Sequence, residues 1–82
     1  MRYIVKVTNY DKLGFSNEHG KYLYKGDTFF EYTSDIYKAR NFRTKESAQK
    51  RADDIYNHDV EFRYKVPRET KVVGIEIKEV EI

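Results

Sequence analysis

The sequence predicts an α+β fold in which a single α-helix packs on one face of an antiparallel β-sheet, with a β-hairpin at the C-terminal end. Two patterns predict this fold class. Residues 3–8 and 60–66 alternate between apolar and polar side chains, which is the period of a β-strand. Between residues 44 and 58 the apolar side chains recur at helical spacing. A chain of 82 residues has room for one domain, residues 1–82, with a thin core.

The N-terminal half is expected to form β-strands. The first strand, with its regular alternation, is expected to bury one face. Residues 13–16 and 21–24 flank a polar loop in which Gly20 can adopt the left-handed conformation that closes a β-hairpin. A turn around Gly26 then leads into a further strand at residues 28–33.

The helical part is predicted by its caps and by its apolar stripe. Ser34 and Asp35 are expected to cap one short helical turn, and Thr44 is expected to cap the main helix, because such side chains accept a hydrogen bond from an N–H of the first turn. The residues that helical spacing places on the buried side are Ala48, Ala52, Ile55 and Tyr56. The small alanines let the helix approach the sheet closely.

After the helix, the alternation predicts a strand at residues 60–66, whose apolar members are Val60, Phe62, Tyr64 and Val66. Pro67 ends this strand because it has no backbone N–H to donate. A turn at residues 68–70 leads to a last strand containing Val73, Ile75 and Ile77, which completes a terminal hairpin. Val80 and Ile82 have the opposite parity, so a β-bulge is expected near Lys78.

The core follows from these elements. The residues expected inside are Val5, Val7, Phe30, Phe42, Ile55, Phe62, Val73, Ile75 and Ile77. The chain has eight tyrosines, too many for so small a core. Those expected near the surface are Tyr10, Tyr22, Tyr24, Tyr37 and Tyr64, and some of them are candidates for an interface.

The composition argues against several classes of protein. There is no Cys, so disulfides, thiolate nucleophiles and thiolate metal sites are excluded. Lys6 interrupts the first apolar run, and no segment approaches the roughly 18 consecutive apolar residues of a membrane-spanning helix. We therefore expect a cytoplasmic protein with neither a signal peptide nor a membrane span.

No arrangement of catalytic or metal-ligating residues stands out. His19 and His58 are far apart in sequence, and both are expected to be exposed, with His58 in a structural role near the end of the helix. The paired carboxylates at residues 53–54, and those at positions 59 and 61, fit ion pairing on a surface better than acid–base or metal chemistry. The sequence therefore predicts a protein that is not an enzyme and that holds no cofactor or metal.

The strongest local charge lies in residues 38–51, where six basic residues accompany one acidic residue. The candidate binding residues are Tyr37, Lys38, Arg40, Arg43, Lys45, Lys50 and Arg51. Such a surface is often only solvated; otherwise it suits an acidic protein or the phosphates of a nucleic acid, with a tyrosine stacking on a base. Residues 52–82 contain five basic and eight acidic residues, which disfavours a long nucleic acid.

One run of residues resembles a known group of proteins. The run is Ala39-x-x-Phe42-x-Thr44-x-x-x-Ala48-x-x-x-Ala52, after a strand-rich N-terminal half and before a β segment. In this it resembles small accessory proteins of uncharacterised function from tailed phages of low-GC Gram-positive bacteria. The resemblance implies a protein made in the cytoplasm of an infected cell, where it binds a host or mobile-element protein; it implies no catalytic residue.

Two hypotheses for function follow. The first is a non-enzymatic protein-binding module that occupies the surface of a partner through residues 38–51 and nearby tyrosines. The alternative is nucleic-acid binding through the same residues. The exposed edge of the terminal hairpin could also pair with a second copy to give a homodimer.

Overall fold

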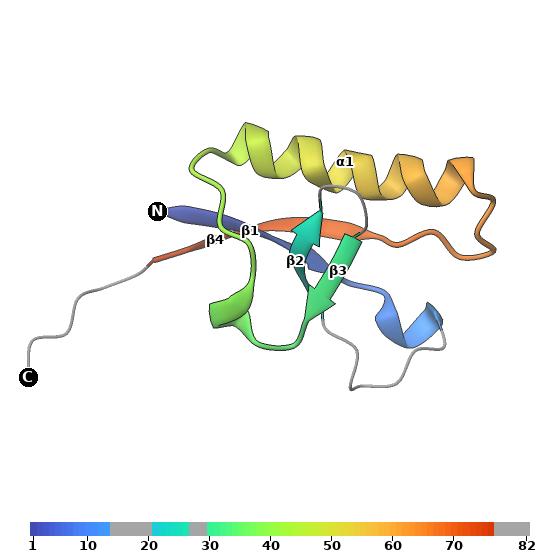
Figure 1. Ribbon diagram of the computed structural model, residues 1–82, viewed down its shortest axis with the longest axis horizontal. Helices are drawn as coiled ribbons and strands as arrows, with labels where there is room; N and C mark the ends of the chain where they lie inside the picture. The colour runs from blue at the N-terminus through green and yellow to red at the C-terminus, as the bar shows by residue number, and fades with distance from the viewer. Residues whose placement is uncertain (14–20, 27–29, 77–82) are drawn as a thin grey trace, which may run out of the picture.

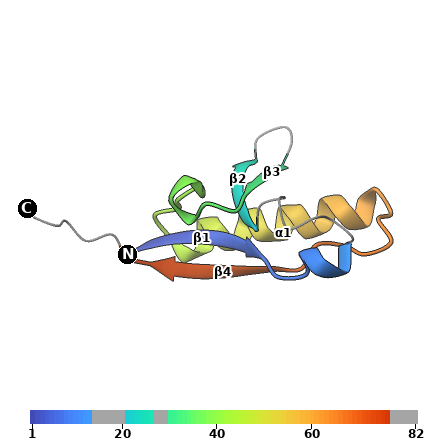
Figure 2. The same ribbon diagram turned by 90° about the horizontal axis from the view of Figure 1, so that it is seen from below.

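The computed structural model describes residues 1–13, 21–26 and 30–76. Its antiparallel sheet has the strand order β3-β2-β1-β4. The strands are β1 (Arg2–Val7), β2 (Tyr22–Gly26), β3 (Phe30–Thr33) and β4 (Thr70–Ile75), and the helix is α1 (Lys45–Glu61). Figures 1 and 2 show α1 lying along one face of β1 and β4. β2 and β3 run side by side at a steep angle to β1 and β4. The predicted α+β class, with one helix on one face of an antiparallel sheet, is confirmed.

β1 is the central strand around which the rest is arranged. Along one edge it pairs with β4 over six residues, from Arg2↔Ile75 to Val7↔Thr70. Along the other edge it pairs with β2 at Lys6↔Tyr22 and with the bridge residue Phe42 at Tyr3. We expected one buried face, but Ile4 and Val5 point to opposite faces and both are completely buried. Both faces of this strand are therefore covered at this point.

The core forms between α1 and the sheet. Ala48, Ala52 and Ile55 line the inner side of the helix and pack in one cluster with Val5, Leu23 and Phe42. The alanines bring the helix close to the strands, so most of the buried volume comes from the larger partners. Burying Ile55 alone contributes about 1.5–3 kcal/mol to folding.

The predicted core is partly right. Val5, Val7, Phe42 and Ile55 are buried, and Phe30, Val73 and Ile75 are half-buried. The prediction that Phe62 lies in the core is wrong, because 63% of its surface is exposed. The prediction that Tyr56 belongs to the buried stripe of the helix is also wrong. Tyr56 follows Ile55 by about 100° around the helix axis, and it is half exposed. The next inward position after Ile55 is Asp59, which is fully buried.

Both predicted caps are present. Thr44 has an extended backbone, and its hydroxyl oxygen accepts a hydrogen bond from the Ser47 N–H at 3.2 Å. Asp35 caps the 3-10 turn η2 (Ile36–Lys38) by accepting a hydrogen bond from the Tyr37 N–H at 2.9 Å. These caps satisfy N–H groups that the turns themselves leave unpaired.

The strand predicted at residues 60–66 does not form. Val60 and Glu61 are the last residues of α1, and Phe62 is its C-cap. The helix continues past His58 because Asp59 extends its inner side and is bound there, as described below. β4 meanwhile takes β1 as its partner, so the predicted last strand is present but pairs with the N-terminal strand instead of residues 60–66.

Several other expectations fall at or beyond the ends of the described ranges. Leu13 belongs to a 3-10 turn, η1 (Tyr10–Leu13), so the strand predicted to begin there is wrong at its first residue. Gly26, which was expected in a turn, is the last residue of β2. The predicted loop with Gly20 and the parts of the chain containing Ile77 and Lys78 lie outside the described residues.

The end of α1 is a complete Schellman motif with an unusual residue in its left-handed position. The Tyr64 N–H donates to the Asp59 carbonyl at 3.0 Å, and the Arg63 N–H donates to the Val60 carbonyl at 3.1 Å. Arg63 has φ 57°, a conformation that glycine adopts without penalty. The motif satisfies carbonyl groups at the helix end and turns the chain toward β4.

We expect Arg63→Gly to stabilise the fold by about 1 kcal/mol, because it relieves the cost of the left-handed backbone. Urea unfolding of dilute protein measures the change. Arg63→Ala is the matched control: it removes the same side chain but keeps the strained conformation, so it should give no such gain. Equal stability of the two variants would contradict this account of the helix end.

Candidate functional site

The predicted basic segment begins in a connection that is fixed to the sheet. The Arg40 N–H donates to the Leu23 carbonyl of β2 at 2.8 Å. Phe42 exchanges two hydrogen bonds with Tyr3 of β1, at 2.7 and 2.9 Å. Ala39 and Phe42 are buried, so the segment is anchored by both backbone and side chains. Residues 39–42 are therefore held against the sheet, and the other candidate side chains lie just before and just after them.

Tyr37 is the most exposed large side chain of this connection. It is 94% exposed, although the Asp35 cap bonds its own N–H. Its neighbours Ile36 and Lys38 are exposed as well. We call residues 36–45 the cationic connection. It contains the predicted binding candidates Tyr37, Lys38, Arg40, Arg43 and Lys45, and it also exposes Ile36, which the sequence analysis did not select.

The structure divides the predicted set of basic residues. Lys38, Arg40, Arg43 and Lys45 lie in the cationic connection, where the Arg40 guanidinium sits 5.3 Å from the centre of the Phe42 ring. Lys50 and Arg51 lie further along α1 and on different sides of it, because successive residues are about 100° apart. Arg51 also lies 3.7 Å from Asp54, the surface pairing expected from the sequence.

A second surface, at the other end of α1, was missed by the sequence analysis. Its large apolar side chains, between 39% and 63% exposed, are those of Val60, Phe62, Tyr64 and Val66. Arg63 and Lys65 lie between them and are exposed too. We call this the terminal apolar surface (residues 60–66). The residues are those of the predicted strand, whose apolar face was expected to lie inside.

A shallow groove borders the terminal apolar surface. It has a volume of about 510 Å³, and the residues that line it are Leu13, Tyr64, Lys65, Val66 and Arg68. Among the described lining residues the charged ones, Lys65 and Arg68, are both basic, and Arg68 is already paired with Asp59.

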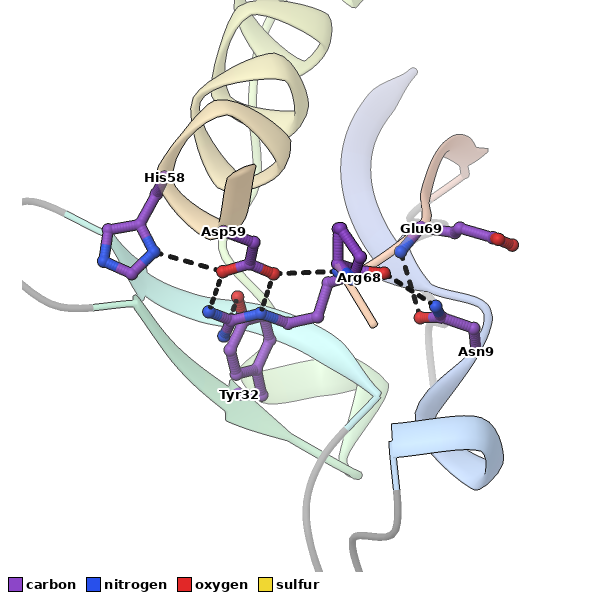
Figure 3. Close-up of polar contacts among 7 residues, drawn as sticks. Asn9, Tyr32, His58, Asp59, Arg68 and Glu69 are labelled. Atoms are coloured by element: carbon purple, nitrogen blue, oxygen red, sulfur yellow. Dashed lines mark hydrogen bonds and ion pairs between the residues drawn. The ribbon is translucent and has the colours of Figure 1, made fainter. Parts of the chain in front are cut away.

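A buried ion pair fixes this end of the molecule (Figure 3). Asp59 is fully buried, and Arg68 binds it with a two-pronged contact, Nε to Oδ2 at 2.7 Å and Nη2 to Oδ1 at 2.5 Å. The Arg68 backbone N–H donates to the same Oδ2 at 2.8 Å. Planar guanidinium and carboxylate groups match each other in this geometry. The pair joins the end of α1 to the residues just before β4.

Neighbouring residues complete the cluster. The third Arg68 nitrogen, Nη1, donates to the Tyr32 hydroxyl at 2.7 Å, and the guanidinium lies over the Tyr32 ring at 5.0 Å. Nδ1 of His58 lies 3.1 Å from Asp59 Oδ1. The Asn9 side chain accepts from the Glu69 N–H at 3.0 Å and donates to the Pro67 carbonyl at 2.9 Å, so it fixes both sides of Arg68.

The protonation states follow from these contacts. Burial by itself raises the pKa of the Asp59 carboxyl, but the hydrogen bonds from Arg68 and His58 outweigh burial and hold this pKa below its ordinary value. Burial raises the pKa of the Tyr32 hydroxyl, which therefore stays protonated. With both Asp59 oxygens and three Arg68 nitrogens engaged internally, the cluster is built for structure, and the expected surface role of the Asp59 carboxylate is wrong.

The remaining predicted residues are placed as follows. The His58 ring is half-buried and packs against Phe62 at 4.7 Å between ring centres, against Phe30 at 5.6 Å and against Tyr64 at 5.8 Å. Tyr10, expected near the surface, is buried and meets Tyr32 edge to face. His19 lies outside the described residues.

Comparison of the chain with protein-family models, with curated proteins and with solved structures finds no match. In the part of the chain that the structure describes, no three His, Asp or Glu side chains are grouped so that they could hold a metal ion. Over the same residues, no helix has both the length and the apolar character needed to cross a membrane. Evidence about function therefore comes from the two surfaces.

We expect Arg68→Met to destabilise the fold by about 3–5 kcal/mol, because it leaves the Asp59 carboxylate buried without its partner. The double variant Asp59→Leu with Arg68→Met should lose less, since it removes both charges. Chemical denaturation of the two variants decides the point. If the single variant lost less than about 0.5 kcal/mol, the ion pair would not be the anchor of this region.

The lowered pKa of Asp59 also predicts a pH dependence. The unfolded chain takes up a proton near pH 3.9, above the folded-state pKa, so the stabilisation is present above that pH and is lost as the pH falls through the folded-state pKa. Asp59→Asn should therefore be less stable than the natural sequence at neutral pH and should approach it in stability at low pH. Urea midpoints measured between pH 2 and pH 6 test this; parallel curves would contradict it.

Proposed function

We propose that the protein is a non-enzymatic protein-binding module and that the cationic connection is its binding surface. The observation that carries this proposal is the almost complete exposure of Tyr37 on a capped turn, directly before residues that hydrogen-bond to β1 and β2. An exposed tyrosine on a firm support provides a large apolar contact, and little conformational entropy is lost when it binds.

The charges around Tyr37 indicate the kind of partner. Lys38 follows Tyr37 directly and is exposed, Arg43 is exposed further along the cationic connection, and Lys45 lies in the first turn of α1, where a cation is mildly unfavourable with the helix dipole. An acidic protein surface with a small apolar pocket would complement this arrangement. Following the resemblance of the Ala39–Ala52 run, we propose that the protein is a phage accessory protein and that its partner is a host or mobile-element protein in the host cytoplasm.

Nucleic-acid binding receives less support from the same residues. Lys50 and Arg51 are separated from the cationic connection around α1, and Arg51 is close to Asp54. The phosphates of one nucleic-acid strand would therefore contact only some of the predicted basic residues. A strong dependence of binding on salt concentration, or loss of the captured partner after nuclease treatment, would favour the nucleic acid.

We expect the variant Tyr37→Ala to weaken partner capture at least tenfold, as a central aromatic contact does when it is removed. Lys38→Glu with Arg43→Glu should weaken it further by reversing the local charge. All three side chains are exposed, so circular dichroism and the urea midpoint should not change. The measurement is quantitative affinity capture from a host lysate, with and without nuclease.

Lys50→Glu is compared with Lys38→Glu alone as the matched control, because each reverses one charge of the predicted basic segment and Lys50 lies on the side of α1 opposite the buried stripe. It should leave capture unchanged. If it reduced capture as much as Lys38→Glu alone, general charge attraction would explain binding and the cationic connection would not be the site.

A further inference from the structure

All the charged residues of β1 and β4 lie on one face of the sheet. Val5 of β1 and Val72 of β4 are paired, and both pack on the core beneath α1. Because side chains alternate between the two faces of a strand, Arg2, Lys6 and Lys71 point to the opposite face. No other residue of these two strands is charged. Figure 1 shows α1 above β1 and β4, so the view from below in Figure 2 looks onto this other side, which we call the outer sheet face.

Two of these cations face each other across the strands. Lys6 and Lys71 are directly paired, and like charges in such a pair destabilise a sheet. Arg2 lies about 13 Å from Lys6 along β1. Arg2 and Lys71 are exposed, Lys6 is half-buried, and none of the three forms an ion pair with the described residues. A repulsion that the fold does not compensate is expected where the residues serve a ligand.

An aromatic ring lies beside the paired lysines. Tyr22 of β2 is paired with Lys6, so it belongs to the outer sheet face, while the next residue, Leu23, lies in the core on the other side. Tyr22 is half-buried, as is Val73 of β4. Ile4 is buried at the centre of this face, so a ligand meets the residues around it. The outer sheet face therefore offers cations next to a partly open ring and aliphatic surface.

A small hollow next to Lys6 extends the positive charge. It has a volume of about 170 Å³, and its described lining residues include Lys6, Lys21, Thr8 and Asp11. Among the charged ones two are basic and one is acidic, so the hollow favours an anion over a cation. It is large enough for a phosphate group.

We propose that the outer sheet face binds a short single-stranded nucleic acid, with phosphates at Arg2, Lys6 and Lys71 and a base against Tyr22. Cations on neighbouring strands suit a chain of closely spaced anions, and a tyrosine ring beside them suits the face of a base. The bases of a duplex are stacked inside it and cannot lie on such a ring, whereas those of a single strand can.

The nearby acidic residues limit the length of this site and do not block it. Asp53 and Asp54 are on α1, on the other side of the sheet (Figure 1). Glu69 and Glu76 are exposed directly before and after β4, so the site takes only a few nucleotides. This binding goes beyond the proposed protein binding and shares no residue with the cationic connection. Tyr37→Ala should therefore leave it unchanged, and its loss should leave partner capture in place.

Fluorescence anisotropy with a labelled oligonucleotide of about ten nucleotides, as DNA and as RNA, tests the proposal. The full chain should bind both, and the logarithm of the affinity should fall linearly with the logarithm of the salt concentration. Lys6→Gln with Lys71→Gln should weaken binding about tenfold and reduce this slope by about 1.4, because each phosphate contact of a single strand contributes about 0.7. Lys50→Gln with Lys65→Gln removes the same charge from exposed positions elsewhere and should have a much smaller effect.

Lys71→Glu separates loss of binding from loss of folding. It places opposite charges in the cross-strand pair, so the urea midpoint should rise while binding is lost. Tyr22→Leu should weaken binding at least about fivefold, as the loss of a stacked base does, and Tyr22→Phe should keep it.

Absence of binding at low salt, equal losses in the two double-lysine variants, or tighter binding of a duplex of the same sequence would overturn the proposal. Equally tight binding of polyglutamate would also overturn it, because the face would then recognise charge alone. A urea midpoint of Lys71→Glu below that of the natural sequence would contradict the repulsion between Lys6 and Lys71. Full binding by Tyr22→Leu would overturn the contact with a base.

Discussion

The ion pair between Asp59 and Arg68 is the contact on which the C-terminal half of the structure depends. It joins the last turn of α1 to the start of β4, and through the Tyr32 hydroxyl it also reaches β3. Burying two charges costs several kcal/mol each, which their attraction repays only when the geometry is good and the remaining polar atoms are bonded. Here both conditions hold, because both Asp59 oxygens are bonded and Arg68 uses three side-chain nitrogens and its backbone N–H.

The same pair explains the path of the chain between α1 and β4. With Asp59 held inside, α1 extends to Glu61, and the Schellman motif then turns the following residues outward. The aromatic residues after the helix lie outside the core, to which α1 contributes Ala48, Ala52 and Ile55. They remain at the surface around His58. The terminal apolar surface is therefore a product of how the helix ends.

The fold class, the helix and its caps could be predicted from the sequence, because Thr44, Asp35 and the alanine stripe act locally. The strand at residues 60–66 could not be rejected, since an alternating pattern shows which side chains are apolar and not whether anything covers them. Asp59 gave no signal either: a lone carboxylate reads as a surface residue until its partner, nine positions away, is brought beside it. The basic segment was visible along the chain, but its division around α1 appears only in three dimensions.

The 17 residues of α1 span about 25 Å. Substitutions separated by more than about 10 Å and sharing no neighbours usually act additively on free energy. Changes at the start of the helix and changes at its end should thus be selected independently of each other. Residues at the start of the helix can change with a partner protein without altering the stability contributed by the residues at its end. Either end can therefore be engineered without compensating changes at the other.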